Sequence, residues 1–318
     1  MYPLLLSPEF KDYIWGGTKL RTDFNKTCDF EKIAESWELA CHKDGNSTIT
    51  NGEFKGLTLA QYIDKCGKAV LGENCEKFSS FPILIKLIDA KDNLSVQVHP
   101  DNDFALANEG EYGKTEMWYI VDCEPNSELI FGLAKEISKE DFAKRINDNT
   151  LLDVVKKVPV KKGDTFFIKS GTLHAIGKGI VIAEIQQNSN TTYRVYDYGR
   201  VDANGKFREL HIEKAVSVTD LFPAKIENFG VMQTFDGYTL EPLASCEYFD
   251  ANRLEINEVA KLIADNNSFH SILVLDGSAE LIANGEIFDI KKGNSIFIPA
   301  GFGDYLISGE CEIILTKI

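Results

Sequence analysis

Two polar side chains in the segment LSVQVHPD, residues 94–101, have a spacing that would let them act on one target. Gln97 and His99 are two positions apart in an alternating run, so on a β-strand both side chains would leave the same face of the sheet. An amide and an imidazole would then point to one place. Their chemistry depends on which other polar side chains the fold brings to that face.

Short β-strands are predicted to position these side chains. Several segments are rich in Ile, Val, Phe and Tyr and are bounded by Gly, Asn, Asp or Pro, which favours β structure with frequent turns. The segments are 81–90, 94–99, 116–122, 128–133, 164–171 and 179–187. Such spacing indicates a sandwich or a barrel.

Helices are predicted as inserts in this β scaffold, at about 56–80, 101–114 and 138–150, with a further helix over 211–220. Thr58 is followed three residues later by Gln61, which fits a capping box, and Ser138 is followed three residues later by Asp141, which approximates one. The elements do not alternate as a βαβ repeat. The fold class predicted is therefore all-β with helical inserts.

An internal repeat indicates two copies of one β module. The segment VKKGDTFFIKSGTLHAIGKG (160–179) aligns without gaps with IKKGNSIFIPAGFGDYLISG (290–309), 130 residues further on. The second copy has Asp304 where the first has His174. One module keeps an imidazole that the other lacks, as expected for one working site and one structural domain.

The net charge of the 318-residue chain is −15, which disfavours binding to nucleic acid or to an anionic membrane. An anionic ligand would need a local basic cluster. The start of the chain lacks a signal-peptide pattern and no apolar run has membrane-spanning length, so a cytoplasmic location is predicted. The seven cysteines form no CxxC pair and are assigned no chemistry.

A motif around His174 resembles one of the cupins, which are small antiparallel β-barrels of jelly-roll type that carry a metal inside the barrel mouth. The motif G-D-x(5)-S-G-x-x-H spans residues 163–174 and resembles the second cupin motif. The first cupin motif normally has His-x-His and a later Glu, and this chain has Gln97-x-His99 and Glu116. The resemblance implies two cupin-type modules: a catalytic domain over 1–230, and a C-terminal domain without a metal site over 231–318.

Several departures from the common cupin pattern resemble the type I phosphomannose isomerases (mannose-6-phosphate isomerases). The shared phrases are AESWELA, LSVQVHPD, GKTEMWYI and GTLHAIGKG, and the resemblance covers at least residues 13–200. It implies a short bacterial form of an enzyme that interconverts mannose 6-phosphate and fructose 6-phosphate. It implies one zinc ion per chain, with a ligand set of Gln97, His99, Glu116 and His174, whose atom types suit zinc and leave room for a substrate oxygen.

The resemblance also implies roles for other residues. Lys114, Glu184 and Arg194 match catalytic positions of the family. The family usually has an Asp four positions before this Arg, whereas this chain has Asn190. Candidates for contact with the sugar phosphate are Ser95, Lys86, Trp15, Glu35 and Arg200.

The implied reaction moves a proton between C1 and C2 of the sugar through a cis-enediol(ate). A cation near both oxygens would lower the barrier by holding charge that appears in the transition state. Zinc is a redox-silent Lewis acid, and a neutral Gln97 would leave it more electrophilic than a second carboxylate would. Arg194 could stabilise the developing oxyanion, and either Lys114 or Glu184 could be the general base.

Two alternatives remain at the level of sequence. An iron-dependent cupin dioxygenase would use a similar histidine and carboxylate site, although Gln97 in place of His weakens that interpretation. A non-enzymatic sugar-binding cupin would keep the fold without chemistry. The sequence leaves open the general base, the hexose specificity, the native metal, the pathway and whether the chain is a monomer or a homodimer.

Overall fold

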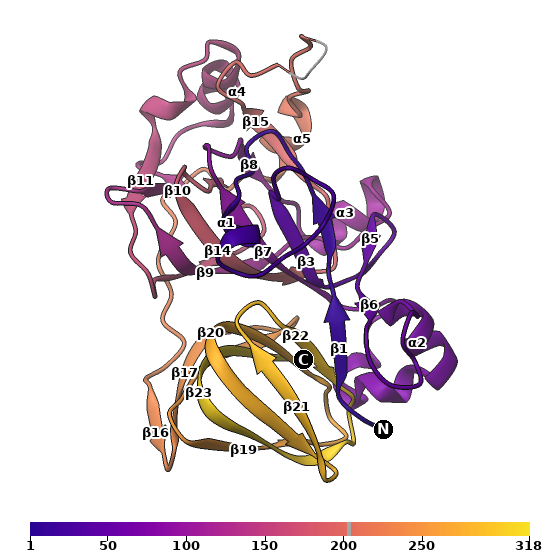
Figure 1. Cartoon of the computed structure of the whole chain (residues 1–318). Coiled ribbons are helices and arrows are strands. Elements are labelled where there is room, and N and C mark those ends of the chain that lie inside the picture. Colours follow the sequence, from indigo (N-terminus) through magenta and orange to yellow (C-terminus); the bar gives the residue numbers. More distant parts are fainter. Residues whose placement is uncertain (202–204) are drawn as a thin grey trace.

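A six-stranded antiparallel sheet forms the middle layer of the molecule (Figure 1). The computed structural model describes residues 1–201 and 205–318. In order across this sheet, the strands are β12 (Thr165–Ile168), β9 (Glu116–Cys123), β14 (Ile180–Gln187), β7 (Ile83–Ala90), β3 (Glu35–Leu39) and β2 (Glu9–Lys11). Every residue of β7 and β14 is buried. Their nearly continuous apolar sequences follow from a sheet that is covered on both faces.

A five-stranded antiparallel sheet covers one face of the six-stranded sheet. Its strands, in order, are β11 (Val155–Pro159), β10 (Glu128–Leu133), β13 (His174–Ala175), β8 (Val96–Val98) and β15 (Tyr193–Tyr196). A core that includes Trp118, Ile182 and Phe131 joins the two sheets. The outer face of the five-stranded sheet packs against two helices, α4 (Lys139–Asn147) and α5 (Ile212–Val218).

A ten-stranded sheet built mainly from the C-terminal part of the chain covers the other face of the six-stranded sheet (orange to yellow in Figure 1). Its main path is β16 (Gln233–Phe235), β17 (Tyr238–Ser245), β18 (Asp250–Ile256), β23 (Gly303–Lys317), β20 (His270–Ala283), β22 (Ser295–Ile298), β1 (Leu4–Ser7) and β6 (Thr48–Ile49). Off this path, β19 (Val259–Ala264) pairs with β23, and β21 (Glu286–Lys291) pairs with β20. Because β1 and β6 belong to this sheet, its pairing crosses the domain boundary predicted near residue 230, and that boundary stays a prediction.

The internal repeat is visible as two turns with the same geometry. Gly163 precedes β12 with φ +92°, and Gly293 precedes β22 with φ +88°. In the first turn the Lys161 N–H donates to Asp164 Oδ2, and in the second the Lys291 N–H donates to Asn294 Oδ1, both at 2.9 Å. A positive φ is readily adopted by glycine, which explains why a glycine recurs at this point of both copies.

Helices occupy the three predicted inserts. The remaining helices and short strands are α1 (Lys19–Thr22), α2 (Leu59–Cys66), α3 (Asn102–Asn108), the 3-10 helices η1 (Lys68–Leu71), η2 (Glu73–Cys75) and η3 (Leu151–Asp153), and the hairpin of β4 (Cys41–His42) and β5 (Gly45–Asn46). The Thr58–Gln61 capping box at the start of α2 is confirmed in both directions. Among the described residues, no helix combines the length and the apolar character needed to cross a membrane.

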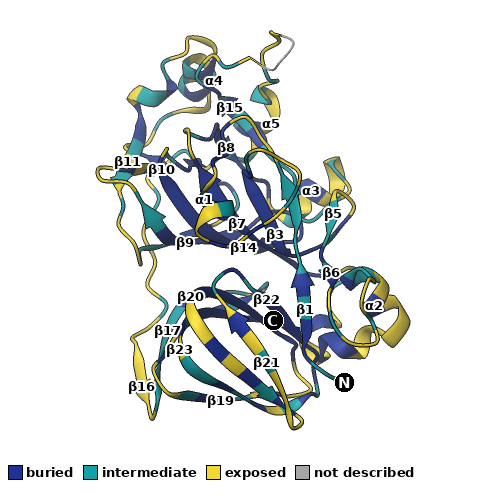
Figure 2. Cartoon of the chain, viewed as in Figure 1, coloured by how far each residue is buried: buried dark blue, intermediate teal, exposed yellow. Residues whose placement is uncertain are grey.

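Buried residues are concentrated in the sheets, and the helical inserts expose much of their surface (Figure 2). The predicted all-β character with helical inserts is confirmed. The described strands form open sheets that pack face to face. The closed form of two barrels therefore stays a prediction.

Candidate active site

A row of three side chains crosses the five-stranded sheet at its inner face. Gln97 on β8 pairs with His174 on β13 and, on the other side, with Arg194 on β15. Directly opposed residues of antiparallel strands share a face, so these three side chains leave the sheet together. Ser95 lies two residues before Gln97 and accepts a hydrogen bond from Arg194 Nε at 3.3 Å. His99 lies two residues after Gln97, just beyond the end of β8.

Several polar residues of the six-stranded sheet lie on the face that packs against the five-stranded sheet, the same face as Trp118 and Ile182. Glu184 on β14 pairs with Lys86 on β7 and with Trp118 on β9. The indole N–H of Trp118 donates to Glu184 Oε2 at 3.0 Å. Glu116 is two residues before Trp118, so the period of the strand places both on one face. The two sheets therefore direct polar groups into the space between them.

His99, Glu116 and His174 form a buried cluster in which one ligand atom from each lies within 4.8 Å of the others. His99 Nδ1 bonds to the Thr191 carbonyl at 2.9 Å, and His174 Nδ1 bonds to the Thr172 carbonyl at 2.8 Å. These bonds place the imidazole proton on Nδ1 in each neutral ring, which leaves each Nε2 lone pair to act as an acceptor. The Lys114 ammonium lies 3.2 Å from His99 Nε2 and donates to it. The two Nε2 atoms face each other at 3.1 Å.

The electrostatics of this cluster favour neutral imidazoles. Burial, with a contribution from Lys114, lowers the pKa of His174 to about 3, and the same two causes hold the pKa of His99 well below its usual value. Glu116 Oε1 is buried without a hydrogen bond and lies 3.4 Å from His174 Nε2. Two facing lone pairs beside an unsatisfied carboxylate oxygen suit a shared cation, and nitrogen and oxygen donors of this kind fit zinc.

Alternating lysines and carboxylates link this cluster to the opposite wall. Lys114 contacts Glu116 closely and lies 3.6 Å from Glu184, while Lys86 lies 3.2 Å from Glu184 and 3.6 Å from Glu35. Burial alone would raise the pKa of Glu184, but Lys114 and Lys86 outweigh it and lower the pKa to about 2. Glu184 is therefore a carboxylate at any working pH. Burial, with a contribution from Glu184, raises the pKa of Glu116 to about 7.

A cavity of about 300 Å³ contains most of the predicted site residues, and its volume is at the lower end of the range for small-molecule sites. The predicted residues that line it are Trp15, Glu35, Lys86, Ser95, Gln97, Lys114, Glu184 and Arg194. The cavity is also lined by Asn190, which stands where the family usually has an Asp, and by Tyr13, Thr192 and Arg208, which the sequence did not single out. The individual roles of all these residues remain predictions.

Arg200 is the one predicted substrate-contacting residue that does not line this cavity. Its guanidinium is bound to the Asp197 carboxylate and to the Asn93 carbonyl. Arg208 lines the cavity instead. No motif in the sequence marks Arg208, and only its ion pair with Asp197 and its place on the cavity wall identify it as a site residue.

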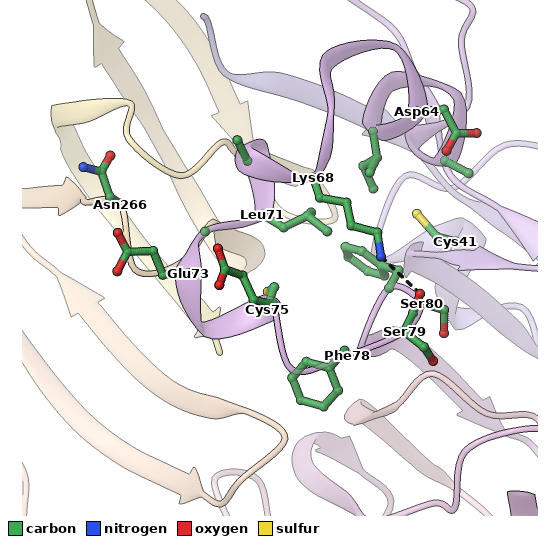
Figure 3. A pocket seen from close by; sticks show the side chains of 16 residues that line it. Cys41, Asp64, Lys68, Leu71, Glu73, Cys75, Phe78, Ser79, Ser80 and Asn266 are labelled. Atoms are coloured by element: carbon green, nitrogen blue, oxygen red, sulfur yellow. Dashed lines mark hydrogen bonds between the residues drawn. The ribbon is translucent and has the colours of Figure 1, made fainter.

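A second cavity, of about 660 Å³, lies between the α2 insert and the segment before β7 (Figure 3). The Lys68 ammonium donates to the Ser79 carbonyl at 3.2 Å, as the dashed line in Figure 3 shows. None of the predicted site residues lines this cavity, and its acidic side chains, Asp64, Glu73 and Glu76, outnumber its one lysine. An anionic ligand would be disfavoured there.

Comparison with known families decides the assignment. Residues 4–150 match the family model "Phosphomannose isomerase type I, catalytic domain", and residues 239–318 match "Mannose-6-phosphate isomerase, cupin domain". The chain is 38% identical over 318 residues to the mannose-6-phosphate isomerase ManA of Bacillus subtilis, covering 99% of each chain. The chain belongs to the type I phosphomannose isomerases. It is therefore an isomerase.

Other relatives of this phosphomannose isomerase agree in length and fold. A mannose-6-phosphate isomerase of Streptococcus mutans is 37% identical over 315 residues, covering 99% of this chain and 98% of the relative. The crystal structure of the mannose 6-phosphate isomerase from Bacillus subtilis superposes with a TM-score of 0.94 at 38% identity, covering 100% of both chains. A mannosephosphate isomerase structure from Archaeoglobus fulgidus, at 22% identity and a TM-score of 0.77, supports the fold alone.

Proposed function

We propose that this isomerase interconverts mannose 6-phosphate and fructose 6-phosphate by moving a proton between C1 and C2 through a cis-enediol(ate). The names of relatives that match along the full length of the chain support this substrate. The observation that carries the proposal is the buried cluster of His99, Glu116 and His174 beside a cavity that also contains Lys114 and Glu184. Proton donors and acceptors thus lie next to a cation site.

Gln97, His99, Glu116 and His174 would hold one zinc ion per chain. When bound, the ion would supply a Lewis acid that lowers the energy of negative charge on the reacting oxygens. The protein fixes the two imidazoles through the carbonyls of Thr191 and Thr172. Such outer hydrogen bonds set the tautomer and orientation of each ring before the ion binds.

Lys114 and Glu184 are the candidates for moving the proton, and Arg194 is the candidate for stabilising the oxyanion. A carboxylate with a pKa of about 2 is a weak proton acceptor, because a general base works best when its pKa is near the working pH. Glu184 would act mainly by holding Lys86 and Lys114 in place. Arg194 stays cationic and is the cross-strand neighbour of Gln97.

Trp15 and Glu35 complete the wall of the cavity. Glu35 accepts a hydrogen bond from the Trp37 indole at 2.7 Å and lies near Lys86. A buried carboxylate that is held by two neighbours is suited to accept a hydrogen bond from a hydroxyl of the sugar. Trp15 is buried and supplies apolar surface for the ring. The cytoplasmic location and a monomeric or homodimeric state stay predictions.

The variant His174→Ala tests the proposal when bound metal and turnover of mannose 6-phosphate are measured on the same preparation. Both are expected to be lost while the circular dichroism spectrum is kept. His270→Ala is the matched control, because it also removes a buried histidine but lies in the C-terminal sheet. Full turnover by His174→Ala without metal would overturn the mechanism. Tightly bound iron with oxygen uptake by the wild type would favour the dioxygenase alternative.

A further inference from the structure

The cations around the active-site cavity differ in how far carboxylates neutralise them. Lys86 lies between Glu35 and Glu184, and Lys114 lies between Glu116 and Glu184. These lysines are therefore poorly suited to take a doubly charged anion, because their charge is already balanced. The excess positive charge must come from other residues.

Arg194 and Arg208 supply that excess at the other end of the cavity. The guanidinium of Arg194 donates to two neutral oxygens, Ser95 Oγ at 3.3 Å and the Glu209 carbonyl at 3.1 Å. Arg208 pairs with Asp197, but Asp197 is shared with Arg200. Among the described residues, three arginines thus face two carboxylates, those of Asp197 and Glu209, and positive charge remains in excess. Burial, and then the charge of Arg208, lowers the pKa of Arg194.

The Asp197 ion pair orients Arg208 without using all of its donors. Arg208 Nε donates to Asp197 Oδ2 at 2.7 Å, and Nη2 donates to Oδ1. This pair uses one edge of the guanidinium. The opposite edge, formed by the Nη groups, has the fork geometry with which arginine takes two oxygens of a phosphate. The bond from Arg194 to the Glu209 carbonyl also fixes the backbone next to Arg208.

We propose that Arg208 binds the phosphate of the substrate and makes the enzyme selective for a sugar phosphate over a free sugar. The inference rests on the proposed function and adds a residue to it. Asp197 is the positioning residue, and Arg194 and the Ser95 hydroxyl complete the same end of the cavity. Arg200 binds the same carboxylate from outside the cavity and does not contact the phosphate.

The pair of arginines on Asp197 gives a matched experiment. Arg208→Ala is expected to raise KM for mannose 6-phosphate by about 10- to 100-fold with a small change in kcat, because charge-assisted bonds to a remote phosphate act equally in ground and transition states. Arg200→Ala also removes one ion pair with Asp197 and is expected to keep KM within about threefold. Arg208→Lys, which keeps the charge but loses the fork, is expected to fall between them.

Inorganic phosphate serves as a probe that does not depend on turnover. Phosphate is expected to raise the melting temperature of the wild type and of Arg200→Ala, but not that of Arg208→Ala. If the wild type lacked isomerase activity yet kept this phosphate effect, the proposed function would fail and the anion site would stand. Equal KM values for Arg208→Ala and the wild type, or loss of the phosphate effect only in Arg200→Ala, would overturn the inference.

Discussion

Glu184 balances two buried lysines with one carboxylate. The variant Glu184→Gln keeps the shape of the side chain and removes the charge, while Lys86 keeps Glu35 and Lys114 keeps Glu116. The fold is therefore expected to survive. Because Lys114 loses one of its two carboxylate partners and with it part of what orients its ammonium, kcat is expected to fall by about 10²-fold. Bound metal should be unchanged, since Glu184 is not in the ligand cluster. Wild-type kcat in this variant would contradict its role.

At the residue scale, the sequence predicted the cluster and most of the residues that line the cavity beside it, but not Arg208. His99, Glu116 and His174 lie in phrases that resemble motifs of the cupins and of the type I phosphomannose isomerases, and the resemblance implied that they converge. The place of Arg208 in the cavity could not be inferred, because it depends on an ion pair with Asp197, eleven positions earlier. An arginine in a polar loop carries no local signal of what it faces.

At the scale of elements, the segment after β14 connects the α3 insert to a metal-ligand candidate. Glu111 lies between α3 and β9 and accepts hydrogen bonds from the Asn190 N–H at 3.2 Å and the Thr191 hydroxyl at 3.3 Å. Thr191 in turn offers its carbonyl to His99 Nδ1. Glu111 therefore helps to hold the group that sets the orientation of His99, although it lies outside the cluster itself.

The variant Glu111→Ala is accordingly expected to weaken zinc binding by about 10-fold, as loss of an outer-shell partner does in other metal sites. Competition with a chelator of known affinity measures this effect. Glu109→Ala is the matched control, because Glu109 lies two residues away but bonds to Tyr193 and Lys214 instead. Equal zinc affinity in all three proteins would show that the Thr191 carbonyl stays in place without Glu111.

The strands themselves were largely predictable, and their partners were not. The segments 128–133 and 179–187 could be recognised because they are apolar and end at turn residues. The pairing of Arg194 with Gln97 joins residues almost one hundred positions apart. Register of this kind is set by packing between distant strands, which no local pattern encodes.

At the scale of the whole molecule, the C-terminal sheet contains an acid-sensitive group. His270 is buried and bonds to the Tyr305 hydroxyl at 2.7 Å, and burial lowers its pKa from 6.5 to about 4. The folded state resists protonation that the unfolded chain accepts below about pH 6.5. The free energy of unfolding is therefore unaffected by His270 protonation above pH 6.5, and it decreases as the pH falls from 6.5 toward 4.

We expect the free energy of unfolding to fall by about 2 kcal/mol between pH 7 and pH 5 because of this one group. His270→Gln should have a lower free energy of unfolding than the wild type at pH 7. Between pH 7 and pH 5, its free energy of unfolding should fall by about 2 kcal/mol less than that of the wild type. Urea unfolding of both proteins at both pH values measures the difference. An identical pH dependence in the two proteins would assign the acid sensitivity to other residues.

The repeat predicted two related modules, and the matching turns at Gly163 and Gly293 agree with it. The way in which the modules share strands was not predictable. The sequence of Leu4–Ser7 has no feature that indicates which sheet the strand joins, yet the strand pairs with β22 of the C-terminal sheet. Pairing with β22 lets Leu4 and Leu6 join the core that is buried between the six-stranded sheet and the C-terminal sheet.

The pairing of β1 with β22 places residues near 4 beside residues near 297. A ribosome makes the chain from the amino end, so β1 emerges long before β22, its partner. Until then its edge stays open to other chains. Maturation of this enzyme is thus tied to synthesis of β22, and a chaperone that shields β1 until then would protect an edge that is exposed for long.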